Sequence, residues 1–218
     1  MDGLDLAALD ALPVFPLPDL VFFPGTLLPL HIFEPRYREM IADVLAGARP
    51  LAVVRIVKGH EAAQAGQPPI CDVAGAGVLV GSDRLPDGRY NIMVRGVARV
   101  RVLAEHPRRR SYREVRARVL PDTHTTRPET LGPSHAALVA LLDQLASAVP
   151  EGGDNLRQLA RAMPTPAACA DVVASAIVRD PDARQTLLEL LDPADRLDQV
   201  LAYVTALHAR FTRPETAN

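Results

Sequence analysis

Lysine is almost missing from this chain of 218 residues, because Lys58 is the only lysine among 24 basic residues. Arginine cannot replace lysine as a catalytic amine, since its pKa stays above about 12. A phosphate-binding Gly-Lys-Ser/Thr loop is also absent, because Lys58 stands between Val57 and Gly59. These absences exclude most lysine chemistry and a P-loop nucleotide site. We therefore expect no catalytic residues and neither ATPase nor peptidase activity.

Cysteine, aromatic residues and long apolar runs are scarce as well. Tryptophan is absent and aromatic residues make up 4 % of the chain, so a stacking surface for single-stranded nucleic acid is poorly supplied. Cys71 and Cys169 form no CxxC pair, which favours two packed, unbridged thiols. The acidic N-terminus lacks a signal-peptide pattern, and no apolar run reaches the roughly 18 residues of a membrane span. We expect a cytoplasmic protein that makes no contact with a membrane.

Metal-binding patterns are missing too. His60 and Glu61 begin a near match to the HExxH motif, but Gln64 occupies the position of the second ligand. The six histidines show no other ligand spacing. We therefore expect neither a bound metal nor a cofactor.

Residues 12–122 have mostly the sequence patterns of β-strands. The short apolar runs at 12–17 and 27–30 contain prolines, which lack the N–H that a sheet ladder uses. Edge or bulged strands are therefore expected at both runs. The apolar, β-branched run at 51–57 predicts a buried strand.

The most regular strand pattern lies around a hairpin turn. Asp87-Gly88 between β-type runs at 73–80 and 90–103 predicts that turn, because glycine accepts the positive φ it needs. Residues 94–102 alternate between apolar and basic side chains, which predicts a half-buried strand with one exposed arginine face. The arginines of that face are Arg95, Arg99 and Arg101.

Helical patterns occur once within the strand region and again throughout the second half. Pro35, an apolar stripe at spacings of three and four, and Gly47 predict one inserted helix over 35–47. From about residue 131 the period becomes 3.6 residues, with stripes at 138–149, 156–163, 172–177, 187–191 and 197–211.

Capping residues mark three of the later helix starts. Thr165, Asp180 and Asp192 each precede a proline, so a side-chain oxygen caps the helix while the proline presets φ. The polar segment 121–133 is interpreted as a linker, which predicts two domains, residues 1–122 and 123–218.

Three ordered motifs point to a known family. Residues 12–17 (LPVFPL), 23–25 (FPG) and 28–41 (LPLHIFEPRYREMI) closely resemble the amino-terminal substrate-binding domain of Lon proteases. Residues 87–96 are similar to the family's DGRYxIxxxG segment, and residues 184–197 to its KQxLLExxDxxxRL segment. The resemblance implies an α+β fold, a PUA-like β-pseudobarrel with one inserted helix, followed by a C-terminal helical bundle.

The resemblance does not carry enzymatic activity to this chain. A full Lon protease continues into an ATPase module and a Ser–Lys peptidase domain, whereas this sequence ends at Asn218 without a P-loop. We therefore expect a stand-alone Lon-type domain that lacks both.

Most motif residues are expected to be structural, with Phe15, Phe33, Tyr37 and Met40 in the core. A helix-start ion pair is expected between Glu34 and Arg38, which lie four residues apart. The full set of motif residues is Phe15, Pro24, Gly25, His31, Phe33, Glu34, Arg36, Tyr37 and Met40.

A candidate contact site for polypeptide is Leu20-Val21-Phe22-Phe23, which lies between two turn signals. Bulky apolar residues with little strand length to hide in can stay exposed, and exposed apolar patches mark protein contacts. Adjacent residues of an extended segment point to opposite sides, so one phenylalanine should face inward and the other outward.

Basic charge is concentrated in residues 95–118. Nine arginines against two glutamates give this band a charge of +7 and leave −9 for the rest of the chain. Arg108, Arg109 and Arg110 are consecutive, so they cannot all point into a core, and they are candidate contacts for a polyanion. The alternative is a solvated face that pairs with the acidic helical half.

These observations favour a non-catalytic module that binds unfolded or degron-bearing polypeptide, or a partner protein. Binding would combine main-chain pairing at a sheet edge with apolar pockets. An RNA-binding module that uses the band 95–118 is the alternative, since PUA-like folds permit it. A small-molecule hydrolase is the third and weakest hypothesis.

Overall fold

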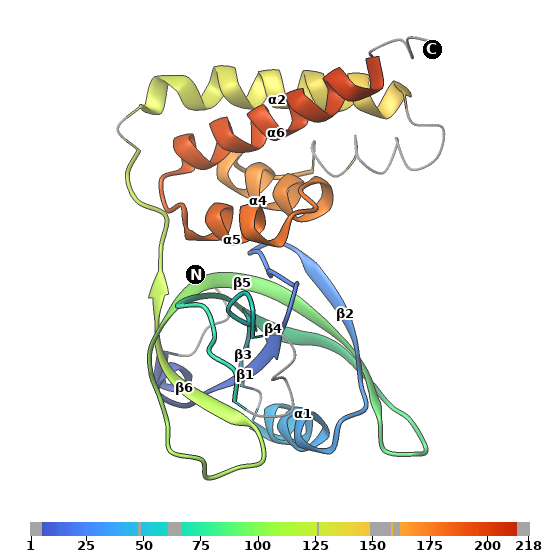
Figure 1. Ribbon diagram of the computed structural model, residues 1–218, viewed down its shortest axis with the longest axis vertical. Helices are drawn as coiled ribbons and strands as arrows, with labels where there is room; N and C mark the ends of the chain where they lie inside the picture. The colour runs from blue at the N-terminus through green and yellow to red at the C-terminus, as the bar shows by residue number, and fades with distance from the viewer. Residues whose placement is uncertain are drawn as a thin grey trace. The chain divides into compact units, whose positions relative to one another are not determined.

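A computed structural model describes residues 6–47, 49–60, 67–125, 127–148, 158 and 162–212. The chain divides into two units, residues 1–121 and 122–218. Among the described residues, the first holds six strands, the short 3-10 helix η1 (Leu6–Ala11) and helix α1 (Pro35–Gly47), and the second holds helices α2, α4, α5 and α6 (Figure 1).

The strands of the first unit form a barrel with one additional strand. The sheet order is β2-β5-β4-β3-β1-β6, and a further pairing of β5 with β6 closes a ring of five strands with β2 outside it. Only β1 and β3 run parallel. The α+β pseudobarrel with one inserted helix is thereby confirmed. Its elements are η1 (Leu6–Ala11), β1 (Leu12–Leu17), β2 (Leu27–Ile32), α1 (Pro35–Gly47), β3 (Leu51–Arg55), β4 (Val73–Arg84), β5 (Tyr90–Glu105) and β6 (Arg113–Leu120).

The prolines have different positions in β1 and β2. Strand β2 is an edge strand, as predicted, whereas β1 lies between β3 and β6, so the prediction of an edge or bulged strand is wrong there. The Leu17 carbonyl accepts a hydrogen bond from Ile56 on the β3 side. Alternation then turns the Pro13 nitrogen toward β3 and the Pro16 nitrogen toward β6. Pairing with β3 begins at Val14 and pairing with β6 ends there, so neither proline interrupts a ladder.

Strand β5 belongs both to the barrel and to a three-stranded arm, β2-β5-β4. Its first half pairs with β2 and its second half with β6. Val97 is skipped in the pairing with β4, and this bulge reverses the alternation of side chains. Arg95 therefore lies on the opposite face from Arg99 and Arg101, and Arg99 is buried. The prediction of one continuous exposed arginine face is wrong, because the bulge changes the alternation.

Two apolar clusters stabilise the first unit. One fills the barrel, since all five strands of the ring contribute to it. The other lies between α1 and the sheet and includes Phe15, Phe22, Ile92 and Val94. Helix α1 has the predicted bounds and buries Tyr37, Met40, Ile41 and Val44, but Leu45 of the predicted stripe is exposed.

The second unit is a bundle of helices with the predicted caps. Its helices are α2 (Pro128–Ala148), α4 (Pro166–Ile177), α5 (Pro181–Glu189) and α6 (Pro193–Thr212). The Thr165, Asp180 and Asp192 side chains accept hydrogen bonds from backbone amides of the first helical turns. Helix α2 begins at Pro128, inside the predicted linker. Most of the stripe at 156–163 lies outside the described residues.

A buried arginine links three parts of the helical unit. The Arg196 side chain on α6 is fully buried and contacts Asp122 at 3.0 Å and Asp171 of α4 at 3.0 Å. Arg196 also donates a hydrogen bond to the Leu190 carbonyl. A buried guanidinium with two carboxylates fixes the start of this unit against α4 and α6.

Candidate functional site

The arm β2-β5-β4 has one face packed on the core and one face open to solvent. Side chains that lie directly opposite on paired strands share a face. Leu28, Val94 and Leu79 are opposite one another and join the core cluster. Their neighbours point to the other side: Leu27, Pro29 and His31 of β2, Asn91, Met93 and Arg95 of β5, and Val78, Gly81 and Asp83 of β4.

Large apolar side chains are exposed on this open side or next to it. Leu27 is 60 % exposed, Phe33 is 61 % exposed and Val80, the extra residue of a bulge in β4, is 50 % exposed. Pro29 and the half-buried Met93 lie between them in the pairing register. A hollow of about 600 Å³ is lined by residues 29–31, 81–83 and 91–93. We call Leu27, Pro29, Phe33, Val80 and Met93 the β2 face.

A polar chain orders the end of the β2 face. The His31 ring nitrogen Nδ1 lies 2.7 Å from the Asn91 side-chain oxygen, and Nε2 lies 3.2 Å from an Arg89 guanidinium nitrogen. Arg89 also contacts Asp87 at 2.6 Å, and the backbone hydrogen bond from Arg89 lowers the pKa of the Asp87 carboxyl. Because Asn91 accepts and Arg89 donates, the ring has a fixed orientation and tautomer.

Phe33 lies against this oriented ring and not in the core. The Phe33 and His31 rings are stacked, with centroids 6.3 Å apart. The prediction of a core position is wrong for Phe33, because β2 ends at Ile32 and its last outward side chain is His31. The sequence signal that was missed is the alternation Leu27, Pro29, His31.

The outer backbone edge of β2 is available for pairing. Within the part of the chain that the structure describes, β2 pairs with β5 alone. The Thr26 carbonyl accepts from Gly96 on β5, so by alternation the polar backbone groups of Leu27 and His31 point to the free edge. Pro29 supplies only a carbonyl there. A sheet edge of this kind can accept an extended peptide.

The segment Leu20-Val21-Phe22-Phe23 is placed differently from the prediction. Leu20 is half-buried, whereas Val21, Phe22 and Phe23 are all buried. The prediction of one outward phenylalanine is wrong, because residues 18–26 form no strand and have no alternation to follow. A role of these four residues in binding polypeptide stays a prediction, without the exposure on which it was based.

Glycines in the sheet make room for this segment. A Cβ on Gly75 would lie 2.0 Å from the Phe22 carbonyl oxygen, and a Cβ on Gly96 would lie 2.2 Å from that of Phe23. A Cβ on Gly77 would lie 2.8 Å from the Phe22 ring. The backbone of Phe22 and Phe23 therefore crosses β4 and β5 where side chains are missing. Glycines at alternate strand positions were the sequence signal for this packing.

The other motif residues are structural in the described chain. Phe15 and Tyr37 form an edge-to-face pair with ring centroids 4.4 Å apart, and Arg36 stacks over Tyr37 at 4.6 Å. Met40 is fully buried. Gly25, after Pro24, has a φ of 76° and closes a turn before β2. Glu34 pairs with Arg36 at 2.8 Å and not with Arg38, so the predicted ion pair is wrong in its partner.

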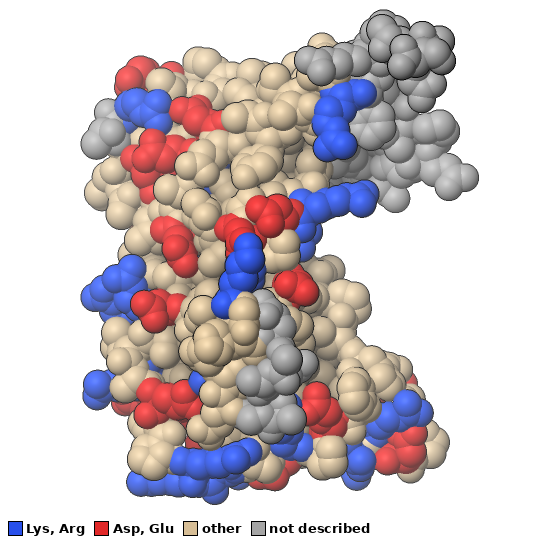
Figure 2. Space-filling model, viewed as in Figure 1, with Lys and Arg blue, Asp and Glu red and all other residues tan. Residues whose placement is uncertain are grey.

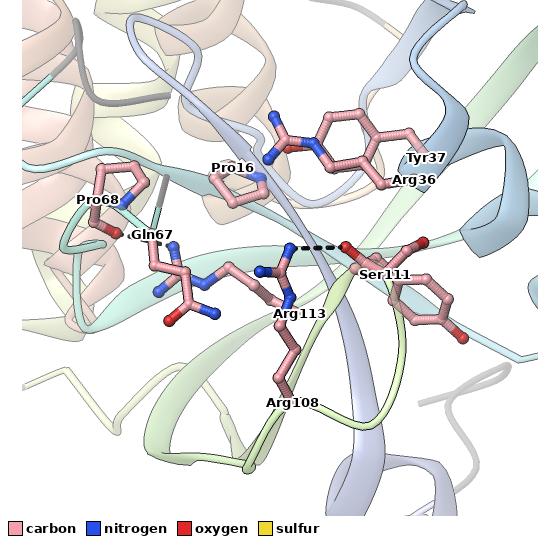
Figure 3. Close-up of a pocket in the computed structure, with 9 residues that line it drawn as sticks. Pro16, Arg36, Tyr37, Gln67, Pro68, Arg108, Ser111 and Arg113 are labelled. Carbon is pink, nitrogen blue, oxygen red and sulfur yellow. Dashed lines mark hydrogen bonds between the residues drawn. The ribbon is translucent and has the colours of Figure 1, made fainter. Parts of the chain in front are cut away.

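The three consecutive arginines lie on the connection between β5 and β6. Arg110 contacts Asp43 of α1 at 2.7 Å, and Arg108 donates to the Ser111 carbonyl at 3.2 Å (Figure 3). The adjacent cavity has a volume of about 10 Å³, room for about one water molecule. Two of the three guanidinium groups therefore have partners within the protein, and Arg109 is exposed.

Tyr112 fastens this connection to α1. Its hydroxyl donates to the Asp43 carboxylate at 2.8 Å, and the Arg49 guanidinium donates to the same hydroxyl at 3.4 Å. Burial, and then the hydrogen bond to Asp43, raise the pKa of Tyr112 to about 12. Figure 2 shows basic side chains gathered at the foot of the strand unit, where this connection lies in Figure 1.

Other classes of site receive no support from the described residues. No group of three or more histidine, cysteine or acidic side chains there could hold a metal ion. Glu61 and Gln64 of the near match to HExxH lie outside the described residues. None of the described helices is long and apolar enough to cross a membrane. Cys169 is buried and Cys71 is half-buried, and both are unbridged.

Curated sequences similar to this chain are Lon proteases. It is 27 % identical to the Lon protease of Roseiflexus castenholzii over 200 residues, which cover 89 % of this chain and 24 % of that protein. It is 27 % identical to the Lon protease of Geobacter metallireducens over 204 residues, with 91 % and 24 % covered. The chain thus spans about a quarter of the length of these curated relatives.

Solved structures with the same fold are Lon amino-terminal domains. A Lon N-terminal domain protein from Xanthomonas campestris has a TM-score of 0.64 and 25 % identity, with 88 % of this chain and 97 % of that chain covered. The N-terminal domain of a Mycobacterium avium complex Lon protease has a TM-score of 0.70 and 18 % identity, with 90 % and 98 % covered.

The family profile extends from η1, through the barrel and its arm, to the last helix. The profile described as the ATP-dependent protease La (LON) substrate-binding domain matches residues 11–206. It includes the motif residues that build the core, the glycines under the Phe22–Phe23 segment and all of the β2 face. With the sequence motifs, the barrel topology and the profile in agreement, this chain belongs to the Lon substrate-binding domain family.

Proposed function

We propose that this chain binds non-native polypeptide without catalysing a reaction, and that the β2 face is the contact surface. The observation that carries the proposal is a row of exposed apolar side chains beside a free sheet edge. Soluble proteins seldom leave such a patch uncovered unless it binds something. The family, named for substrate binding, supports polypeptide as the ligand.

An extended peptide suits both parts of this surface. Its backbone would form hydrogen bonds with the free backbone groups of Leu27 and His31. Such bonds do not depend on the side chains of the peptide. Its apolar side chains would cover Leu27, Val80 and Phe33, which favours unfolded over folded proteins because folded proteins bury such residues. Arg95 and Asp83 lie on the same side, so charged groups of both signs flank the apolar row.

The test is binding of a fluorescent, chemically unfolded model polypeptide to the variant L27S/F33S. Both side chains are exposed, so folding should be unaffected. Each apolar side chain contributes about 1.5–3 kcal/mol when buried, so the affinity should fall at least about tenfold. A matched control is L45S/Y203S, which removes two exposed apolar side chains elsewhere.

Hydrogen exchange tests the pairing at the sheet edge. The amides of Leu27 and His31 should exchange more slowly when polypeptide is bound, because they gain partners. Equal affinity of the two double variants and the natural protein, with no slowing at these amides, would refute the assignment of the β2 face.

A further inference from the structure

Exposed arginines also lie on barrel strands β5 and β6, apart from those of the β5–β6 connection. Arg101 of β5 lies directly opposite Arg118 of β6, and both side chains are exposed. Neither makes an ion pair within the part of the chain that the structure describes. Like charges directly opposite each other destabilise a sheet. This pair therefore weakens the barrel unless something else neutralises it.

A third arginine and one apolar side chain complete the same surface. Arg116 precedes Arg118 by two residues, so it shares its face, and it is also exposed. Leu103, the extra residue of a bulge opposite Arg116, is 48 % exposed. We call Arg101, Arg116, Arg118 and Leu103 the arginine face.

Other arginines of the strand unit form ion pairs with acidic side chains of the same unit. Arg110 contacts Asp43, and Arg113 makes a two-pronged contact with Glu105 at 2.7 and 2.8 Å. Glu114, the one acidic residue in the same row of β6, contacts Arg49 at 3.7 Å. Glu105 and Glu114, the acidic residues within β5 and β6, thus pair with other arginines, which leaves the arginine face complementary to an anionic partner.

We propose that the arginine face binds an acidic polypeptide segment in an extended conformation. Alternate residues of a strand are about 6.7 Å apart, so alternate carboxylates of such a segment match the spacing of Arg116 and Arg118. Guanidinium groups hold carboxylates through paired, charge-assisted hydrogen bonds. Leu103 adds an apolar contact that a peptide can use.

A nucleic acid fits this face less well. Residues 99–105 and 113–120 contain no aromatic side chain on which a base could stack. The proposal uses none of the residues of the β2 face and depends on charge where that site depends on apolar area. The two proposals can therefore fail separately.

The test measures anisotropy of a labelled ten-residue peptide that alternates glutamate and serine. The variant R101Q/R118Q should bind it about tenfold more weakly, because two charge-assisted contacts are lost. The control R108Q/R109Q removes the same charge and should weaken binding less than about threefold, as expected for a long-range effect alone. The variant L27S/F33S should bind this peptide normally.

A thermal melt of each variant separates binding from folding. R101Q/R118Q should melt at or above the temperature of the natural protein, since it relieves repulsion, and the peptide should no longer raise its melting temperature. Equal loss of affinity in both arginine double variants would overturn the proposal. So would a uridine oligonucleotide of equal charge that binds more tightly than the peptide and is lost with R101Q/R118Q, which would make the face a nucleic-acid site.

Discussion

At the scale of single residues, Gly75 lies so close to Phe22 that an added Cβ would be 2.0 Å from the Phe22 carbonyl oxygen. Added methyl groups in packed interiors cost about 1–3 kcal/mol, and here the neighbour is backbone that cannot rotate away. We expect G75A to lower the free energy of unfolding by about 3 kcal/mol, measured by urea titration. G81A is the matched control, because its nearest neighbour, the Met93 Cβ, would be 3.5 Å away. Equal stability of the two variants would contradict this account of the Phe22–Phe23 segment.

The Tyr112 hydroxyl gives a second prediction at this scale. Its pKa is about 12 in the folded protein, against an ordinary value of 10.0. The folded state therefore holds the proton more tightly than the unfolded state does. The contribution of the Tyr112 hydroxyl to stability is complete below pH 10 and is lost as the pH rises toward 12.

Comparison of the natural protein with Y112F tests this assignment. The difference in unfolding free energy between them, measured by urea titration at several pH values, should shrink between pH 10 and pH 12. The Tyr37 pKa is also raised, chiefly by burial, but that residue is common to both proteins. A difference that stays constant over this range would show that Tyr112 titrates normally.

Individual side-chain positions were the least predictable part of this chain. Phe33 was expected in the core as a motif residue, and one of Phe22 and Phe23 was expected to face outward, and both expectations were wrong. Phe33 lies just beyond the end of β2, and Phe22 lies in a segment with no strand at all. Phe33 continues the outward alternation of β2 one position past the strand, whereas Phe22 and Phe23 have no alternation to follow.

At the scale of elements, the capping residues were sufficient to predict where three helices begin. The cap at Asp180 is representative, since its carboxylate accepts from the amides of Asp182 and Ala183 at 3.3 and 3.2 Å. We expect D180A to cost about 1 kcal/mol of stability, as for other N-cap replacements. D180N keeps an acceptor and should restore most of that loss. If the asparagine and alanine variants are equally unstable in a thermal melt, the cap does not contribute as proposed.

The positions of several strands could also be predicted from neighbouring residues, whereas the bulges within them could not. The apolar run at 51–57 located β3, alternation over 94–102 located β5, and Asp87-Gly88 located the hairpin, where Gly88 has a φ of 80°. The bulge at Val97 bends β5 and increases its twist, and the side-chain alternation over 94–102 does not show that a residue is extra. The exposed row of Arg95, Arg99 and Arg101 predicted for this strand was consequently wrong, because Arg95 lies on the other side.

At the scale of the whole molecule, the period change near residues 121–133 predicts two domains. The described strands all pair with one another within residues 1–121. We therefore expect a fragment of residues 1–121 to fold alone, with a cooperative thermal transition. Limited proteolysis of the full chain should cut first within 121–127, before the start of α2.

A first cut within α1 or β5 would contradict this division. So would a fragment 1–121 that shows no cooperative transition although the full chain does.

The family and fold could be predicted from ordered motifs that extend over nearly the whole chain. The β2 face could not, because its exposure depends on which edge of the sheet β2 occupies, and that is decided by pairings between distant segments.

The bulge at Val97 has an evolutionary consequence. The open side of the arm and the inside of the barrel are the same side of a continuous sheet. The bulge reverses the alternation within β5, so that Met93 and Arg95 lie on the same side as Val100 of the barrel core. Substitutions can alter the arm's ligand preference one residue at a time and leave the barrel intact. Loss or gain of a single residue between Arg95 and Arg99 would instead turn arginines into the barrel or the ligand-binding row toward α1. Lineages of this domain should therefore diverge in residue identity at the open positions of β5, Asn91, Met93 and Arg95, while keeping the length of the strand constant.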